Sequence, residues 1–360
     1  MCRAISRSAS CPACDRRGAP GNGEPGIRSS QRPSHKALAG IGRAGKRRRA
    51  AASEPRQRGG PPPHSGGHVG CVKRRKVVGK VAVRVGPAGA IIVSRTGGSM
   101  TRTVLITGAG SGFGRGVAFT LAERGHRVIA CGQIWPQVWA LRQEAKARGV
   151  DMQVIKFDVT NEIDRAHALT HDVDVLLNNA AIMESGPLVE IPISVFRSVF
   201  ETNVFAALEV AQGFARRMVV RGHGRIVWMS SVAGLVKVPF DGAYAASKHA
   251  VEGICSAMEE ELKPYGVEVV TINPGAYRTG FNDTGMESMD QWWDQGERVV
   301  AHWPTRELNR QHDPAEMIDA IVTVIEAEAP PYRTVKPESA GQLVRDEQAA
   351  AWERTVGGKR

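Results

Sequence analysis

The chain has 360 residues, of which 42% are hydrophobic, and a formal net charge of +12. This length and apolar content can supply a buried core, which excludes a wholly disordered protein. The charge is unevenly spread, because residues 1–99 hold 21 of the 48 Lys and Arg but only 3 of the 36 Asp and Glu, and they contain no Phe, Trp or Tyr. We therefore predict a low-complexity basic tail over 1–99 and one folded domain over 100–360.

The tail is expected to be disordered, or to be upstream sequence that is not part of the native protein, because Met100 stands directly before the first strand of the domain. Its basic runs at 46–49 and 73–76 have no aromatic residues between them, so no specific nucleic-acid binding is expected. The segment 77–93 is rich in β-branched residues but is interrupted by Gly and Pro, and it is left unassigned.

The cysteines and apolar runs indicate the compartment. Six cysteines in a chain of this length, four of them in the tail, make no disulfide framework. Cys11 and Cys14 form a CxxC with no second ligand pair, so no metal site is predicted. Neither a membrane span nor a secretory signal is expected from the apolar runs of this sequence. These observations favour a cytoplasmic protein.

The domain opens with a β-branched run at 103–107, a glycine-rich turn and an amphipathic helical pattern. Strand, glycine turn and helix together direct backbone N–H groups and a helix N-terminus at a pyrophosphate. The turn has the spacing T-G-x-x-x-G-x-G through Gly108, Gly112 and Gly114, which differs from the common G-x-G-x-x-G. An ordinary turn between strand and helix is the alternative interpretation of this segment alone.

Strand and helix patterns then alternate along the chain. Predicted strands cover 103–107, 127–131, 152–157, 173–177, 225–229 and 267–272, and predicted helices include 136–148, 161–171, 194–221 and 243–263. Such alternation predicts an α/β fold with a doubly wound parallel sheet, Rossmann-like, with helices on both faces. Ligands of that architecture bind at the carboxyl ends of the strands. The polar and turn-forming residues that follow these strands are Asp158, Asn178, Asn179, Ser230, Ser231, Pro274 and Gly275.

Tyr244 and Lys248 are four residues apart at the start of a predicted helix, so they share one face. A nearby ammonium favours a phenolate, and we expect it to lower the Tyr244 pKa and make the residue a general acid or base. The hydroxyl of Ser231, after the neighbouring strand, is expected to hold a substrate oxygen. The alternative is an exposed helix surface that carries one tyrosine and one lysine.

These motifs together resemble the short-chain dehydrogenase/reductase family over about residues 102–335. The resemblance rests on the glycine turn, Asn178-Asn179-Ala180-Ala181, Asn203 in Thr-Asn-Val, Ser230-Ser231-Val-Ala-Gly, Tyr244-x-x-x-Lys248 and Pro274-Gly275-x-x-x-Thr279, in the family's order. It implies a catalytic tetrad of Asn203, Ser231, Tyr244 and Lys248. In that tetrad Ser231 polarises the substrate oxygen, Tyr244 exchanges the proton, Lys248 holds the nicotinamide ribose and Asn203 orders a water relay.

The resemblance also implies the residues that hold the dinucleotide: Gly108, Ser111, Gly112, Phe113, Gly114, Asp158, Val159, Asn179, Ala180, Tyr244, Lys248, Pro274, Gly275 and Thr279. Ala181 and Phe113 stand where the family commonly has Gly and Ile, and both changes leave the backbone donors intact. The second strand ends at Gln133 with no acid to accept a ribose hydroxyl and repel a 2′-phosphate. NADP, or use of both NADP and NAD, is therefore expected.

The segment 277–312 corresponds to the family's variable lid. Its apolar residues are expected either to enclose an apolar substrate or to pack the lid onto the domain. The function predicted is hydride transfer between NAD(P) and an alcohol or ketone group of a small or medium apolar molecule, in a homodimer or homotetramer. The alternative is a non-catalytic dinucleotide-binding regulator. An extended epimerase or dehydratase is disfavoured, because only 28 residues follow Tyr332.

Overall fold

The computed structural model describes residues 81–85, 91–95, 101–293, 299–300 and 311–357. Its main feature is a seven-stranded sheet in the order β5-β4-β3-β6-β7-β8-β9, in which every neighbouring pair is parallel. The strands are β3 (Thr103–Ile106), β4 (Arg127–Gly132), β5 (Gln153–Lys156), β6 (Val175–Asn178), β7 (Gly224–Met229), β8 (Val267–Pro274) and β9 (Arg333–Lys336). The predicted doubly wound parallel sheet is confirmed.

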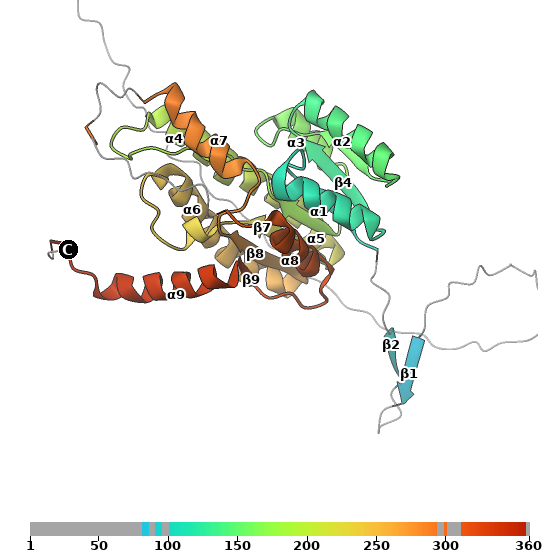
Figure 1. The fold of residues 1–360 in the computed structure, drawn as a ribbon. Coiled ribbons are helices and arrows are strands. Elements are labelled where there is room, and N and C mark those ends of the chain that lie inside the picture. The colour runs from blue at the N-terminus through green and yellow to red at the C-terminus, as the bar shows by residue number, and fades with distance from the viewer. Residues whose placement is uncertain (1–80, 86–90, 96–100, 294–298, 301–310, 358–360) are drawn as a thin grey trace, which may run out of the picture. The chain divides into compact units, whose positions relative to one another are not determined.

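Helices cover both faces of the sheet (Figure 1). One face carries α1 (Gly112–Glu123), α2 (Trp135–Arg148) and α8 (Pro314–Glu326), and the other carries α3 (Glu162–Ala168), α5 (Ala207–Arg221) and α6 (Gly242–Leu262). The remaining helices are α4 (Ile193–Phe200), α7 (Phe281–Glu287) and α9 (Glu338–Glu353). Because apolar surface is buried on both faces, the central strands consist almost entirely of buried residues.

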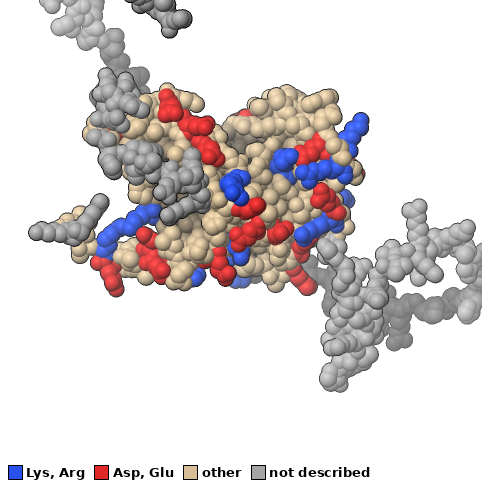
Figure 2. All heavy atoms as spheres, viewed as in Figure 1, with Lys and Arg blue, Asp and Glu red and all other residues tan. Residues whose placement is uncertain are grey.

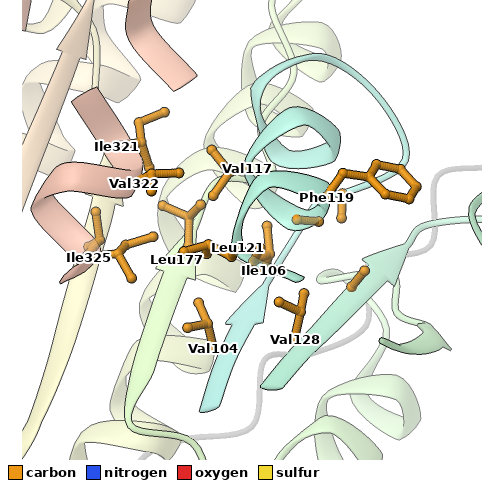
Figure 3. Packing of buried hydrophobic residues seen from close by; sticks show 14 of the residues in the cluster. Val104, Ile106, Val117, Phe119, Leu121, Val128, Leu177, Ile321, Val322 and Ile325 are labelled. Atoms are coloured by element: carbon orange, nitrogen blue, oxygen red, sulfur yellow. The ribbon is translucent and has the colours of Figure 1, made fainter. Parts of the chain in front are cut away.

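The packing of the first face is dense (Figure 3). Val104 and Ile106 of β3 belong to the same buried cluster as Val117 and Leu121 of α1, and Ile321 of α8 completes it. All five side chains are fully buried. Since this cluster holds α1 directly above β3, it also fixes the position of the glycine turn that joins the two elements.

The chain order of the strands reverses between β3 and β6. From β3 the sheet extends to β4 and β5 on one side, and to β6 and the later strands on the other. The connections after β3 and after β6 therefore leave the sheet in opposite directions. This arrangement opens a crevice at the carboxyl ends of the strands, where such folds bind their ligands.

The predicted helical stretch over 194–221 is confirmed, but its middle turn has a geometry that was not predicted. A π-helical turn at Glu201–Ala206 separates α4 from α5. Such turns add one residue to the helical repeat, and they are frequent at functional sites. Asn203 lies inside this turn and is 2% exposed.

Other elements were not predicted. Within the unassigned segment 77–93 and just beyond it, β1 (Val81–Val85) and β2 (Ile91–Arg95) form an antiparallel pair. The edge strand β9 and the C-terminal helix α9 also come from segments to which the sequence analysis gave no element. No helix in the described part of the chain combines the length and apolar character that crossing a bilayer requires. The rest of the basic tail lies outside the described residues.

Candidate active site

A cavity of about 820 Å³ lies at the carboxyl ends of the strands. Nearly all of the predicted site residues line it: Gly108, Ser111, Gly112, Phe113, Asp158, Val159, Asn179, Ala180, Ser231, Tyr244, Lys248, Pro274, Gly275 and Thr279. Gly114 and Asn203 are the two predicted residues that stand behind this wall. The fold thus brings together segments that are as far as 170 residues apart in the chain.

The glycine turn needs glycine for measurable steric reasons. Gly108 and Gly112 have φ values of +64° and +52°, in the left-handed region that side chains disfavour. A Cβ on Gly114 would stand 2.6 Å from both the Asn179 amide nitrogen and the Gly108 carbonyl oxygen. The turn therefore presents bare backbone to the cavity at the N-terminus of α1, as a phosphate cradle requires.

Asn179 braces this turn from the neighbouring strand. Its side-chain amide donates to the carbonyl oxygens of Thr107 (2.8 Å) and Gly108 (3.2 Å). The hydroxyl of Thr107 in turn accepts from the backbone N–H groups of Asn179 and Ala180, each at 2.9 Å. The contribution of Asn179 to the cavity is therefore partly the support that its side chain gives to the glycine turn.

Two glutamines that the sequence analysis did not assign also line the cavity. The Gln133 amide nitrogen lies 3.4 Å from Asp158, and the Gln133 backbone N–H donates to the Gln137 side chain at 2.8 Å. The Gln137 side chain packs directly against Gly110: a Cβ on Gly110 would be only 2.6 Å from the Gln137 side-chain amide. Contacts with Thr160 and Gln133, together with the charge of Lys156, outweigh burial and lower the Asp158 pKa. Position directly after β4 was the only sequence signal for Gln133.

Tyr244 and Lys248 lie on α6 and are buried. The Lys248 Nζ atom is 5.5 Å from the centre of the Tyr244 ring and donates to the Met229 carbonyl oxygen at 2.7 Å. Ser231, which follows β7, lies near the Tyr244 hydroxyl and lines the same cavity, and its own hydroxyl accepts from the Ala233 N–H at 3.1 Å. A tyrosine, a serine and a lysine from two elements therefore converge on one wall of the cavity.

The expected effect of Lys248 on Tyr244 is corrected by the structure. Burial raises the pKa of Tyr244 to about 12, and the nearby Ser231 hydroxyl opposes this rise without reversing it. Burial lowers the pKa of Lys248 to about 8, and the negative charge of Glu252 opposes this fall. Desolvation disfavours the charged form of each group, and in both cases it is the largest cause of the shift.

Asn203 does not line the cavity but makes hydrogen bonds to segments next to it. Its side-chain oxygen accepts from the Ile182 N–H, and its amide donates to the Ile182 carbonyl oxygen, both at 2.8 Å. It also donates to the Ser247 hydroxyl on α6 at 3.0 Å. These bonds join the π-helical turn to the segment after β6 and to the helix of Tyr244.

The described part of the lid closes the cavity with α7 rather than with its tryptophans. Phe281 lines the cavity, and its ring centre is 5.7 Å from that of Tyr244. Trp292 instead packs against Gly186, where a Cβ would lie 2.3 Å from the indole ring. Within the described residues, Phe281 therefore faces the cavity, whereas Trp292 packs the lid onto the domain. Trp303 lies outside the described residues.

A family model described as short chain dehydrogenase matches residues 102–290. The chain belongs to this family. It is an NAD(P)-dependent short-chain dehydrogenase/reductase. The protein named "Uncharacterized oxidoreductase YusZ" from Bacillus subtilis is 31% identical over 233 residues, which are 61% of this chain and 83% of that protein.

Two solved structures, of which the first is described as a short-chain dehydrogenase, share the fold. One, from Streptomyces avermitilis, has a TM-score of 0.58 and 25% identity, and the match covers 71% of this chain and 94% of that one. The other is described as a putative NAD(P)-dependent gluconate 5-dehydrogenase from Beutenbergia cavernae with bound NADP. Its TM-score is 0.53 and its identity 30%, over 62% of this chain and 89% of that one.

Proposed function

We propose that this protein is an NADP-linked oxidoreductase that interconverts an alcohol and a ketone, with Tyr244 as the general acid and base. The observation that carries the proposal is that Tyr244, Ser231 and Lys248 line the same cavity as the glycine turn. Two hydroxyls placed together can both contact one substrate oxygen. A regulator that only binds a dinucleotide has no need of this pair.

The residues present fit a bound dinucleotide. The bare backbone of the glycine turn and the N-terminus of α1 would hold the pyrophosphate, and Asp158 and Val159 would contact the adenine. Asn179 and Ala180 would border its ribose, and Thr279 would meet the carboxamide or phosphates. When bound, the nicotinamide supplies hydride transfer to and from the substrate carbon.

The chain's own residues move the proton. For ketone reduction, Ser231 donates a hydrogen bond to the substrate oxygen, and Tyr244 transfers its phenolic proton to that oxygen as negative charge develops there. Lys248, whose pKa of about 8 leaves it charged at neutral pH, stabilises the phenolate that remains. Alcohol oxidation moves the same proton in the opposite direction, with the Tyr244 phenolate as the base.

The substrate end of the cavity favours an apolar molecule without negative charge. Met183, Val238 and Phe281 line it with apolar side chains. The carboxylates of Glu184 and Glu287 also line it, and acidic side chains lie over α7 in Figure 2. Because carboxylates repel an anion, an uncharged ketone of small or medium size fits better than a carboxylate or phosphate substrate.

The test is NADPH consumption by the full chain with a panel of ketones, followed by absorbance. We expect turnover with at least one uncharged apolar ketone and little with a keto acid of the same size. Tight binding of NADPH, measured by fluorescence, with no turnover of any ketone or of the matching alcohols with NADP⁺ would contradict the proposal.

A second measurement concerns the choice of cofactor. Gln133 and Gln137 stand after β4 where an acid would repel a 2′-phosphate, so we expect NADPH to be accepted at least as well as NADH. Comparison of the Michaelis constants for the two cofactors checks this expectation. A preference for NADH of more than roughly a hundredfold, about 2.7 kcal/mol, would show that the expected use of NADP is wrong.

A further inference from the structure

A buried polar network lies behind the catalytic wall and joins three elements. Glu252 follows Lys248 by one turn of α6 and is 9% exposed. Its Oε1 atom accepts from the Asn273 amide at 2.6 Å, and its Oε2 atom accepts from the Arg333 guanidinium at 2.7 Å. Neither Glu252 nor Asn273 nor Arg333 lines the cavity. None of the three therefore contacts a substrate or cofactor there.

Asn273 connects this network to the backbone of Ser231. Its amide nitrogen, besides its bond to Glu252, donates to the Ser231 carbonyl oxygen at 3.1 Å. Its side-chain oxygen accepts from the Thr271 hydroxyl at 3.2 Å. Asn273 is completely buried, so these bonds leave it a single orientation. The carboxylate of Glu252 thus holds the Asn273 amide, and this amide in turn holds the backbone carbonyl oxygen of Ser231 in place.

The same carboxylate acts on Lys248 through its charge. The groups that interact in this region are Lys248 and Cys255 of α6, Arg333 of β9 and Tyr332 just before β9. Among them the carboxylate of Glu252 favours the ammonium form of Lys248 and opposes the loss of its proton on burial. Glu252 is therefore coupled to two residues that assist the proton transfer of Tyr244, namely Ser231 and Lys248.

We propose that Glu252 is a positioning residue for the reaction: held by Arg333, it fixes the Ser231 carbonyl through Asn273, one helical turn after Lys248 on α6. This inference rests on the proposed function, since it concerns how that site is kept in order. A purely structural ion pair would contribute to stability without influencing the proton chemistry.

The charge of Glu252 is tested by Glu252→Gln, which keeps an acceptor for Asn273. We expect kcat to fall about tenfold with little change in the NADPH KM. The high-pH limb of kcat should move to lower pH by roughly one unit, because Lys248 loses its proton earlier. Arg333→Met removes a positive charge, so it should move that limb to higher pH. If the two variants shift the pH limb of kcat in opposite directions, the ion pair is coupled to the protonation of Lys248, because a general loss of stability would not give opposite signs.

The matched control is Glu123→Gln, which breaks an exposed ion pair of 3.3 Å with Arg148 at the end of α1. It should leave kcat and its pH profile unchanged. If Glu252→Gln lowers only the thermal midpoint and leaves the pH profile of the folded protein unchanged, the positioning role is wrong and the pair is structural.

A readout without turnover separates this inference from the proposed function. In the protein without cofactor, the NMR shift of the Lys248 ε-methylene reports its protonation, with Lys248→Arg for assignment. We expect its midpoint near pH 8 in the wild type, lower in Glu252→Gln and higher in Arg333→Met. Equal midpoints in the wild type and both variants would overturn the coupling even if the enzyme is active. Shifted midpoints in a protein that turns over no substrate would refute only the proposed function.

Discussion

Replacing Tyr244 by Phe is expected to reduce kcat by about a thousandfold or more, because the variant has no proton to give to the substrate oxygen. Tyr244 is buried with its hydroxyl against Ser231, and the ring is surrounded by α6 and Phe281. Phe keeps the ring and its packing. The folded structure and the binding of NADPH should therefore survive, and steady-state kinetics with fluorescence titration measures both.

Ser231→Ala offers a graded comparison for this experiment. It removes one hydrogen-bond donor to the substrate oxygen but keeps the proton source, so its loss should be smaller than that of Tyr244→Phe. A Tyr244→Phe variant that retained more than about a tenth of the wild-type kcat would assign the proton transfer to another group. The cavity would then bind the dinucleotide without using this tyrosine.

Replacing Lys248 by Met is expected to remove most of the activity and yet to increase stability at neutral pH. Burial lowers the Lys248 pKa from 10.5 to about 8, so the folded protein carries a desolvation cost of about 3 kcal/mol whenever this ammonium is charged. The variant loses the bond to the Met229 carbonyl, which costs about 1–2 kcal/mol. A net gain of roughly 1 kcal/mol remains.

The pH dependence of this gain has a definite sign. Between pH 8 and 10.5 the unfolded chain keeps the lysine proton and the folded protein has given it up, so wild-type stability rises with pH relative to the variant. Urea unfolding of both proteins at pH 7 and pH 10 checks this. The advantage of Lys248→Met should be present at pH 7 and shrink as pH rises through that window. An advantage that is constant with pH would show that Lys248 is not buried as an ammonium.

Local patterns were sufficient for much of this protein. The glycine turn could be predicted because strand, turn and helix are contiguous, and steric limits on φ act within single residues such as Gly108. The alternation of strands and helices likewise implied a parallel sheet whose carboxyl ends gather the polar residues. That Tyr244 and Lys248 share a face follows from helical geometry alone.

Properties that depend on surroundings could not be predicted in this way. The sign of the Tyr244 pKa shift depends on burial by distant segments, which a sequence pattern does not measure, and the predicted direction was wrong. The π-helical turn around Asn203 was missed because a single extra residue leaves the apolar pattern almost unchanged. The segment of the edge strand β9 received no element, although Arg333 on it reaches Glu252.

The amino-acid sequence alone was sufficient to predict the family and the sheet and to propose the reacting residues, because these follow from short-range geometry and motif order. Tertiary structure decided which residues meet behind the cavity and which charges are stable inside it. Glu252, Asn273 and Arg333 lie on three elements and become one network only when the sheet and α6 pack together. Hydrogen bonds and desolvation act through space, so they emerge only once the chain is folded.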